Sequence, residues 1–344
     1  MNKFVTGALA VTLVGTTGFA SDSEWPELDR ELEALSSTLS AQGSGPNLSG
    51  WGIVGWNFSG DDPYLVGGED HSGAAFESIR VNVEGGTAGY AYHLSFDLAS
   101  GSAELLDAYG RWDFSDNLHG QIGNFRKPFL QSGLLDRNRT VMIRRTNIAL
   151  SMGMGLVGNL VGRDTGVQID GDFEQIAWAI AVQNGADSVA DEYLLTGRVS
   201  VDIMGEGAGQ WVEGAYNAPD GTNLSVGLAF CDDGFYNDGS RIGLEAYLTN
   251  GPFAASAEVV DNDTDVGDNT PWDATFSWMF NDMWEAALRW EDRDDTADTN
   301  DLTLGVNRYV SGHDAKWQLN WRSSDSDSAA IDGDLITLAL AVSF

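Results

Sequence analysis

Residues 334–344 read DLITLALAVSF, and their side chains alternate between two kinds. Large apolar side chains occupy every second position up to the last residue, and small side chains occupy the positions between them. The apolar set is Ile336, Leu338, Leu340, Val342 and Phe344, and the other set is Thr337, Ala339, Ala341 and Ser343. This period of two is that of a β-strand, whose successive side chains point to opposite faces. The segment therefore predicts a strand with one strongly apolar face.

The same alternation recurs through the chain. It is clearest in residues 90–98, 106–114, 176–182, 224–230, 242–248, 272–280, 284–290 and 315–321. Weaker runs bring the total to about seventeen candidate strands of roughly eight to eleven residues, a length that suits a tilted strand crossing a bilayer. With 42 glycines and only 7 prolines, the composition also favours a β-rich chain with many turns.

Such strands could build a soluble sandwich or propeller with an apolar interior, or a membrane barrel with an apolar exterior. Tryptophans help to decide, because they stand in pairs near strand ends, where a membrane barrel carries its aromatic girdles. These pairs are Trp272 and Trp278, Trp284 and Trp290, and Trp317 and Trp321. The expected fold class is all-β: a transmembrane antiparallel β-barrel of about sixteen strands, formed by residues 51–344.

The first twenty residues, MNKFVTGALAVTLVGTTGFA, have the features of a cleaved signal peptide. Lys3 gives a charged start, an apolar run follows from Phe4 to Val14, and small residues stand at Gly18 and Ala20. The chain is therefore expected to be exported with cleavage after Ala20. Cys231 is the only cysteine and has no internal disulfide partner, so we interpret it as a packing residue.

Residues 21–42 carry the spacing of a coiled-coil helix. Their large apolar residues follow one another at steps of three and four, which predicts a periplasmic helix that joins copies of the chain. A helix that caps its own barrel is the alternative. Residues 43–50, GSGPNLSG, are expected to form a linker. The predicted oligomerisation residues are Trp25, Leu28, Leu32, Leu35 and Leu39.

Positive charge gathers in one segment of a chain whose formal net charge is −34. Residues 124–145, NFRKPFLQSGLLDRNRTVMIRR, hold six of the eighteen Lys and Arg residues. Most of these residues belong to a longer stretch without alternation, residues 126–163. We expect this stretch to fold into the lumen as a constriction loop. Basic side chains there would attract anions and repel cations. The candidates are Arg126, Lys127, Arg137, Arg139, Arg144, Arg145 and Arg163.

Two alternatives for this charge stay open. The loop arginines could pair with acidic lumen residues and only brace the loop, and Arg163 could pair with the adjacent Asp164. Four further arginines fall on the polar face of their strands and could continue an anion path along the wall, or simply face solvent. These are Arg80, Arg111, Arg198 and Arg289.

Three motifs, together with the terminal Phe344, resemble the phosphate-selective porin family of Gram-negative outer membranes, whose members include polyphosphate porins. They are GQIGNFRKPF at 120–129, RRTNIAL at 144–150 and GRDTGVQIDG at 162–171. The resemblance implies a homotrimer of sixteen-stranded barrels in outer-membrane lipid, a loop folded into each lumen, and recognition of Phe344 by the outer-membrane assembly machinery. The stretch SMGMGLVGNLVG, 151–162, departs from the family pattern.

Composition and motifs exclude other classes of function. With 18 basic against 52 acidic residues, the chain is unsuited to nucleic acid. Asp261, Asp263 and Asp265 imitate the start of a calcium loop, but Val266 and Trp272 stand where its glycine and glutamate belong. The four histidines are scattered, and we recognise no catalytic, metal or cofactor motif.

The sequence thus predicts an outer-membrane porin for passive diffusion of small inorganic anions, phosphate or polyphosphate among them, and not an enzyme. A general diffusion porin with neutralised arginines is one alternative. A structural or adhesive barrel whose acidic loops bind divalent cations is another.

Overall fold

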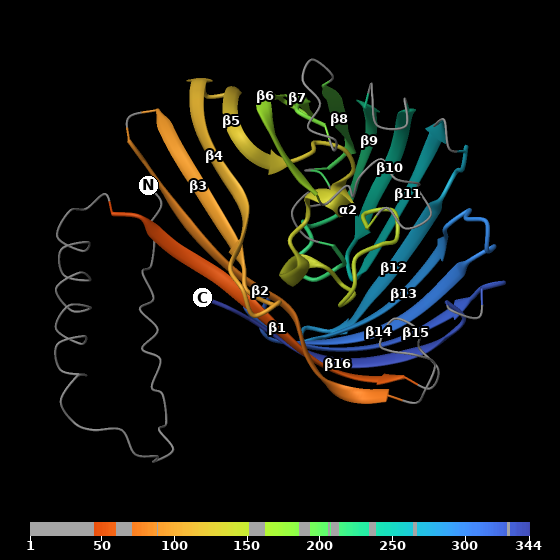
Figure 1. Ribbon diagram of the computed structural model, residues 1–344. Coiled ribbons are helices and arrows are strands. Elements are labelled where there is room, and N and C mark those ends of the chain that lie inside the picture. Colours follow the sequence, from red (N-terminus) through yellow and green to blue (C-terminus); the bar gives the residue numbers. More distant parts are fainter. Residues whose placement is uncertain are drawn as a thin grey trace, which may run out of the picture.

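A computed structural model describes residues 45–59, 71–87, 89–150, 162–185, 193–205, 207, 213–233, 239–263, 267–328 and 331–344. The predicted signal peptide and heptad segment lie outside these residues. Sixteen strands, each paired antiparallel with its neighbours, form one closed barrel (Figure 1). The predicted all-β barrel is confirmed. In the described part of the chain, no helix is long and apolar enough to cross a membrane.

The strands follow one another around the barrel in chain order. They are β1 (Asn47–Ser59), β2 (His71–Thr87), β3 (Tyr90–Asp97), β4 (Glu104–Ser115), β5 (Leu118–Arg126), β6 (Arg163–Phe173), β7 (Ile176–Gln183), β8 (Leu194–Met204), β9 (Thr222–Asp233), β10 (Gly239–Asn250), β11 (Phe253–Asp263), β12 (Trp272–Asn281), β13 (Trp284–Asp292), β14 (Asn300–Ser311), β15 (Ala315–Asp325) and β16 (Gly333–Ser343). Turns of two or three residues, such as those after β4, β6, β10, β12 and β14, join the strands at the end where the chain terminates. We call this the short-turn end.

The barrel closes between β1 and β16, in a register that pairs Trp51 with Ser343. Beyond that pair, the Gly50 N–H donates to the Phe344 carbonyl at 3.1 Å, and the Phe344 N–H donates to the Gly50 carbonyl at 3.0 Å. The expected linker boundary at residue 50 is therefore wrong, because these bonds and the pairing with β2 draw the chain into β1 from Asn47.

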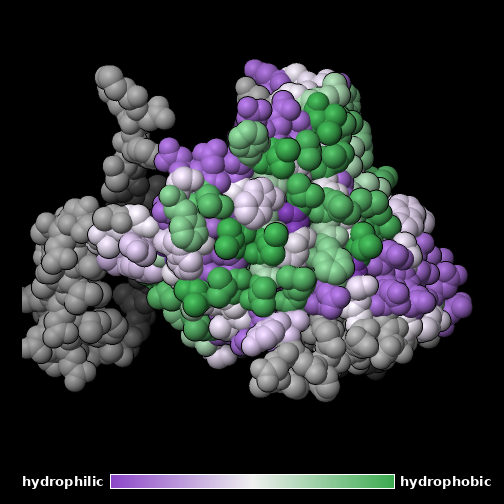
Figure 2. Space-filling model, turned by 90° about the horizontal axis from the view of Figure 1, so that it is seen from above, coloured by the Kyte–Doolittle hydropathy of each residue, from purple (hydrophilic) through white to green (hydrophobic). Residues whose placement is uncertain are grey.

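Side chains sort by parity along the strands. In β16, Thr337 and Ala339 are buried inside, whereas Ile336 and Leu338 are exposed on the outer surface. Large apolar side chains cover that outer surface on many strands, and Figure 2 shows them gathered across the barrel face. An apolar surface of this extent is expected where the surrounding medium is hydrocarbon. Exposed tryptophans on it are Trp56, Trp272, Trp278, Trp290 and Trp317.

Candidate pore and its lumen loop

The connection between β5 and β6, residues 127–162, enters the barrel (Figure 1, yellow). We call it the lumen loop. Its described part includes the one-turn helix α2 (Gln131–Leu134) and the 3-10 helix η1 (Arg137–Arg139). Residues 151–161, which hold most of the stretch that departs from the family pattern, lie outside the described residues.

Apolar contacts fix the lumen loop to one side of the barrel. Phe129, Leu130 and Ile148 are buried with side chains of β8, β9 and β11, including that of Cys231, which packs as predicted. Glycines of the wall make room for the loop. At Gly243 a Cβ would stand 2.8 Å from a Leu130 methyl carbon, and larger residues would push the loop off the wall. Further contacts join Ile143 to β1 and β16, and Val141 and Met142 to β13.

Carboxylates of the wall accept hydrogen bonds from the backbone of the loop. The Gln131 N–H donates to Glu245 at 2.6 Å, and the Asn147 N–H donates to Glu291 at 2.6 Å. The Ser132 N–H donates to Glu258 at 3.0 Å. A loop inside a barrel has no strand partner, so a buried N–H that finds no carbonyl within the loop needs another acceptor, which these carboxylates supply. Part of the acidic surplus therefore holds the loop in place.

Most of the loop arginines are engaged in holding the loop. Arg137 pairs with Glu77 at 3.2 Å and also donates to the Ile143 carbonyl at 3.1 Å. Arg145 is buried and donates to the carbonyls of Ser132, at 2.6 Å, and Leu135. Lys127 is also buried, at the start of the loop. The contacts of Arg137 and Arg145 are those expected for bracing, one of the two alternatives that the sequence left open.

Arg163 does not pair with the adjacent Asp164. Its Nε and Nη2 atoms donate to the two oxygens of Asp107 at 3.0 and 2.9 Å. Neighbouring side chains of a strand point to opposite faces, so the inward Arg163 meets a partner across the sheet rather than along the chain.

Crowding of positive charge is visible in two pKa values of the loop. Burial lowers the pKa of Arg145 well below its ordinary value, and the charges of Arg126 and Arg137 lower it further. Burial by itself would raise the pKa of the Asp136 carboxyl. The charge of Arg126 and the hydrogen bond from it outweigh burial, with help from Arg80, and lower that pKa. Asp136 is therefore held ionised as the counterion of this cluster.

Arg144 lies beside a different part of the wall. It is half-buried and lines a cavity of about 30 Å³ together with Arg289 and Arg322. Arg289 donates to the Arg144 carbonyl at 2.9 Å and to Glu213 at 2.7 Å. The predicted wall arginine Arg289 is thus buried behind the loop, away from the open part of the lumen.

The described residues line a cavity of about 860 Å³ in the lumen, on the side of β1 to β8. The inward side chains of β7 leave it room, because Ala177 and Ala179 are small. Five arginines and four aspartates line this cavity, which we call the passage. The arginines are Arg80, Arg111, Arg126, Arg139 and Arg198, and the aspartates are Asp107, Asp136, Asp170 and Asp172.

Four of the passage arginines have acidic partners. Arg111 donates to both oxygens of Asp170, at 3.0 and 2.7 Å, and Arg126 pairs with Asp136 at 2.6 Å. Arg198 pairs with Glu245. Arg80 lies 3.6 Å from Asp97 and 5.1 Å from the centre of the Trp51 ring.

Arg139 differs from the other four. Its side chain is exposed, and no ion pair joins it to any of the residues that the structure describes. It is held by η1, where the Arg139 N–H donates to the Asp136 carbonyl at 2.8 Å. Among the seven basic residues predicted for the constriction, Arg126 and Arg139 line the passage, and within the described part of the chain Arg139 has no acidic partner.

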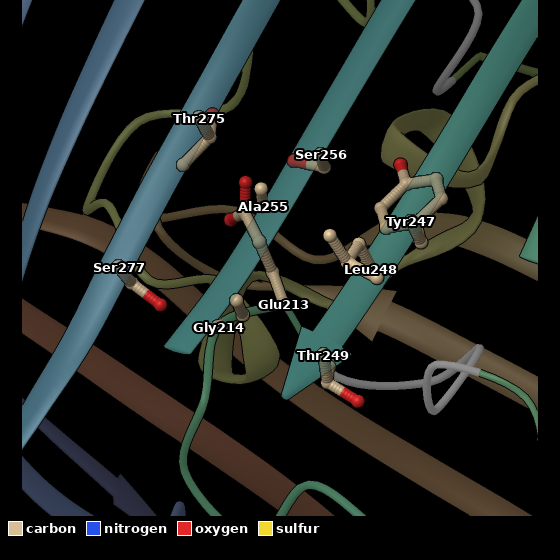
Figure 3. A pocket seen from close by; sticks show the side chains of 10 residues that line it. Glu213, Gly214, Tyr247, Leu248, Thr249, Ala255, Ser256, Thr275 and Ser277 are labelled. Atoms are coloured by element: carbon tan, nitrogen blue, oxygen red, sulfur yellow. The ribbon is translucent and has the colours of Figure 1, made fainter. Parts of the chain in front are cut away.

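A second segment enters the lumen, from the short-turn end. The connection between β8 and β9 spans residues 205–221, and its described part brings Glu213 into the barrel. Figure 3 shows Glu213 between Ser256 of β11 and Thr275 of β12, beside a cavity of about 10 Å³. Its carboxylate accepts from Arg289 and, at 3.0 Å, from the Val141 N–H.

Sequence reasoning missed this segment. The only sequence signal is a run of residues, 205–221, that lacks alternation at an end where neighbouring connections are short turns.

Comparison with known proteins gives the fold a context. No protein-family model matches the chain, and no curated protein matches it. An anion-selective porin from Comamonas acidovorans is 14% identical, with a TM-score of 0.64, over 88% of this chain and 100% of that chain. OmpT of Vibrio cholerae, in its trimer form, is 9% identical, with a TM-score of 0.60, over 88% and 99%. Salmonella typhi OmpF in complex with daunomycin is also 9% identical, with a TM-score of 0.60, over 88% and 98%.

The barrel has a porin-like fold. In this porin-like barrel, no group of three or more described His, Cys, Asp or Glu side chains is arranged to hold a metal ion. Asp265, the third acidic residue of the run at 261–265, lies outside the described residues.

Proposed function

We propose that this protein is an outer-membrane porin, a channel and not an enzyme, through which small anions diffuse passively. The exposed Arg139 in a passage lined by five arginines carries the proposal. A charge in a narrow passage between low-dielectric walls acts over a longer range than in open water, because the solvent that would screen it is displaced. Arg139 therefore attracts permeating anions and raises a barrier to cations.

We further propose inorganic phosphate or polyphosphate as the favoured solute. An arginine offers a planar, multi-donor group that suits phosphate oxygens. Arg80, Arg126 and Arg139 lie along one cavity and could present partial sites in series, from which an ion can leave as well as enter. The resemblance of the motifs at 120–129, 144–150 and 162–171 to the phosphate-selective porins supports the same solute class.

The remaining cellular context belongs to the same proposal. The exposed apolar surface suits outer-membrane lipid, and Phe344 is well placed for recognition by the assembly machinery, since it is exposed at the short-turn end. Export by a cleaved signal peptide, residues 1–20, and assembly as a homotrimer complete the proposal. OmpT of Vibrio cholerae, described as a trimer, shares the fold.

A general diffusion porin is the second candidate. The ion pairs of Arg111, Arg126 and Arg198 favour it, because a paired arginine contributes little net field at a distance. In that case solutes would be sorted by size alone, and Arg139 would be too weak to set a preference.

The test is the reversal potential of the purified protein in a planar bilayer under a KCl gradient, followed by titration with phosphate. We expect a chloride-directed potential and a phosphate-dependent reduction of the current. Arg139→Gln should lower the anion-to-cation permeability ratio. Arg308→Gln is the matched control, because Arg308 is exposed on the outer surface, 5.7 Å from the Trp284 ring centre.

Each other result has a definite meaning. A chloride-directed potential that Arg139→Gln leaves unchanged would refute the role of Arg139. A potential near zero would support the general diffusion porin. A potassium-directed potential would refute anion selectivity, and a bilayer without channels would favour the structural barrel.

A further inference from the structure

We propose that Glu213 is a positioning residue for Arg139, so that the ion preference of the pore depends on a segment that enters the lumen from the short-turn end. This inference rests on the proposed function, because it assigns Glu213 a role in anion selectivity through Arg139. Glu213 itself carries a negative charge, and its direct electrostatic effect on a permeating anion would be opposite in sign to the effect proposed here.

Glu213 holds the backbone at Arg139 and two residues further along the chain. The Glu213 N–H donates to the Arg139 carbonyl at 3.1 Å, and the Glu213 carboxylate accepts from the Val141 N–H at 3.0 Å. Its other oxygen accepts from Arg289 at 2.7 Å, which fixes the carboxylate to β13. One buried residue therefore ties the loop at Arg139 to the barrel wall.

The residues next to Arg139 are held in the same way. Lys316 donates to the Thr140 carbonyl at 2.6 Å, and Asn307 donates to the Val141 carbonyl at 2.9 Å. His313 lies with its Nδ1 atom 3.2 Å from the Asn138 carbonyl. With the backbone fixed by these contacts, the Arg139 side chain is the part of η1 left to extend into the passage. A displacement of the backbone would move the guanidinium group directly.

The segment that carries Glu213 is itself anchored. The Ala215 N–H donates to Glu285 at 2.6 Å, and Tyr309 donates to the other oxygen of Glu285 at 2.5 Å. Tyr216 stacks on Tyr309, with ring centres 3.9 Å apart. Gly214 has a φ of +98°, which favours glycine, and a Cβ there would stand 2.7 Å from a Glu285 oxygen. Residues 213–216 are therefore anchored to the barrel wall.

Two substitutions of Glu213 separate position from charge. Glu213→Ala and Glu213→Gln remove the same negative charge, but only the alanine removes every side-chain acceptor for Val141 and Arg289. If Glu213 acts by position, Glu213→Ala should lower the anion-to-cation permeability ratio by about twofold or more, toward that of Arg139→Ala. Glu213→Gln should keep or raise the wild-type ratio, because its amide oxygen still accepts one of the bonds.

The double variant Arg139→Ala with Glu213→Ala should have the same permeability ratio as Arg139→Ala alone, since the two residues act through one charge. Equal shifts in Glu213→Ala and Glu213→Gln, or a rise in Glu213→Ala, would overturn the inference while leaving the proposed function intact. No effect of Arg139→Ala would instead refute the role of Arg139, on which the inference rests.

If Glu213→Ala fails to assemble, the inference is tested with Tyr216→Ala instead. It removes the stack on Tyr309 and leaves every charge of the pore unchanged. A lower anion-to-cation permeability ratio is expected, and an unchanged ratio in the assembled variant would overturn the inference.

Discussion

Acidification should lower the free energy of unfolding through His313, which lies in the turn that joins β14 to β15 and contacts η1. His313 in that turn is buried against Asn138 and meets the stacked rings of Tyr216 and Tyr309 edge-on, with ring centres 5.5 and 5.3 Å away. Burial lowers the pKa of His313 to about 3, and the charges of Lys316 and Arg139 act in the same direction. The folded protein therefore holds this imidazole neutral.

The size of the effect follows from the difference between the folded and unfolded pKa values. An unfolded histidine has a pKa near 6.5. Below that pH the unfolded chain binds a proton at His313, whereas the folded protein does not until the pH approaches 3. His313 therefore has no effect on the free energy of unfolding above pH 6.5, and it lowers that free energy progressively as the pH falls from 6.5 toward 3. Each pH unit is worth about 1.4 kcal/mol, which amounts to about 3 kcal/mol between pH 6.5 and 4.5.

The assay is urea unfolding in lipid vesicles at pH 7.5 and pH 4.5, for the wild type and His313→Gln. Glutamine can still donate to the Asn138 carbonyl but does not titrate. Carboxylates titrate in both proteins and cancel in the difference between their free energies of unfolding. Between pH 7.5 and pH 4.5, we expect the wild type to lose about 3 kcal/mol more of its free energy of unfolding than His313→Gln does. A difference that stays constant with pH would refute this account, and His119→Gln serves as the control for loss of a histidine elsewhere.

Three further predictions concern the loop and the passage. Phe129→Ala removes a fully buried ring that docks the lumen loop, and it should lower the free energy of unfolding by about 3 to 5 kcal/mol; an unchanged urea midpoint would contradict this. Asp136→Asn removes the ion-pair partner of Arg126 and should raise the anion-to-cation permeability ratio, so a fall in the reversal potential would argue against it. Ala179→Trp should reduce single-channel conductance by filling the passage, whereas Ile180→Trp, on the outer surface, should leave it unchanged; equal conductance in the two variants would refute the assigned position of the passage.

Sequence reasoning located the barrel and its lumen loop because both leave local signals. Alternation in residues 334–344 shows which side chains of β16 face outward, and the loss of alternation between Arg126 and Arg163 marks the long connection. The end of the linker was placed too late in the chain. Hydrogen bonds between Gly50 and Phe344 extend β1 toward the N-terminus, to residues that precede the apolar alternation.

The same reasoning could not rank the arginines of the loop. Arg139 and Arg145 look alike in the sequence, yet Arg145 is buried against two carbonyls and Arg139 extends into the passage. Nor could it pair Arg163 with Asp107, which is 56 residues away. Which partner an arginine meets depends on strand register and on where the loop crosses the wall.

The sequence by itself determined the sheet, the two faces of each strand and the segment that carries the positive charge, because side-chain period and net charge are properties of neighbouring residues. Only the tertiary structure decided that wall carboxylates hold the loop, that the alanines of β7 leave the passage open, and that Glu213 meets Arg139. Those contacts join residues far apart in the chain, and closure of the barrel between β1 and β16 is what brings them within hydrogen-bonding distance.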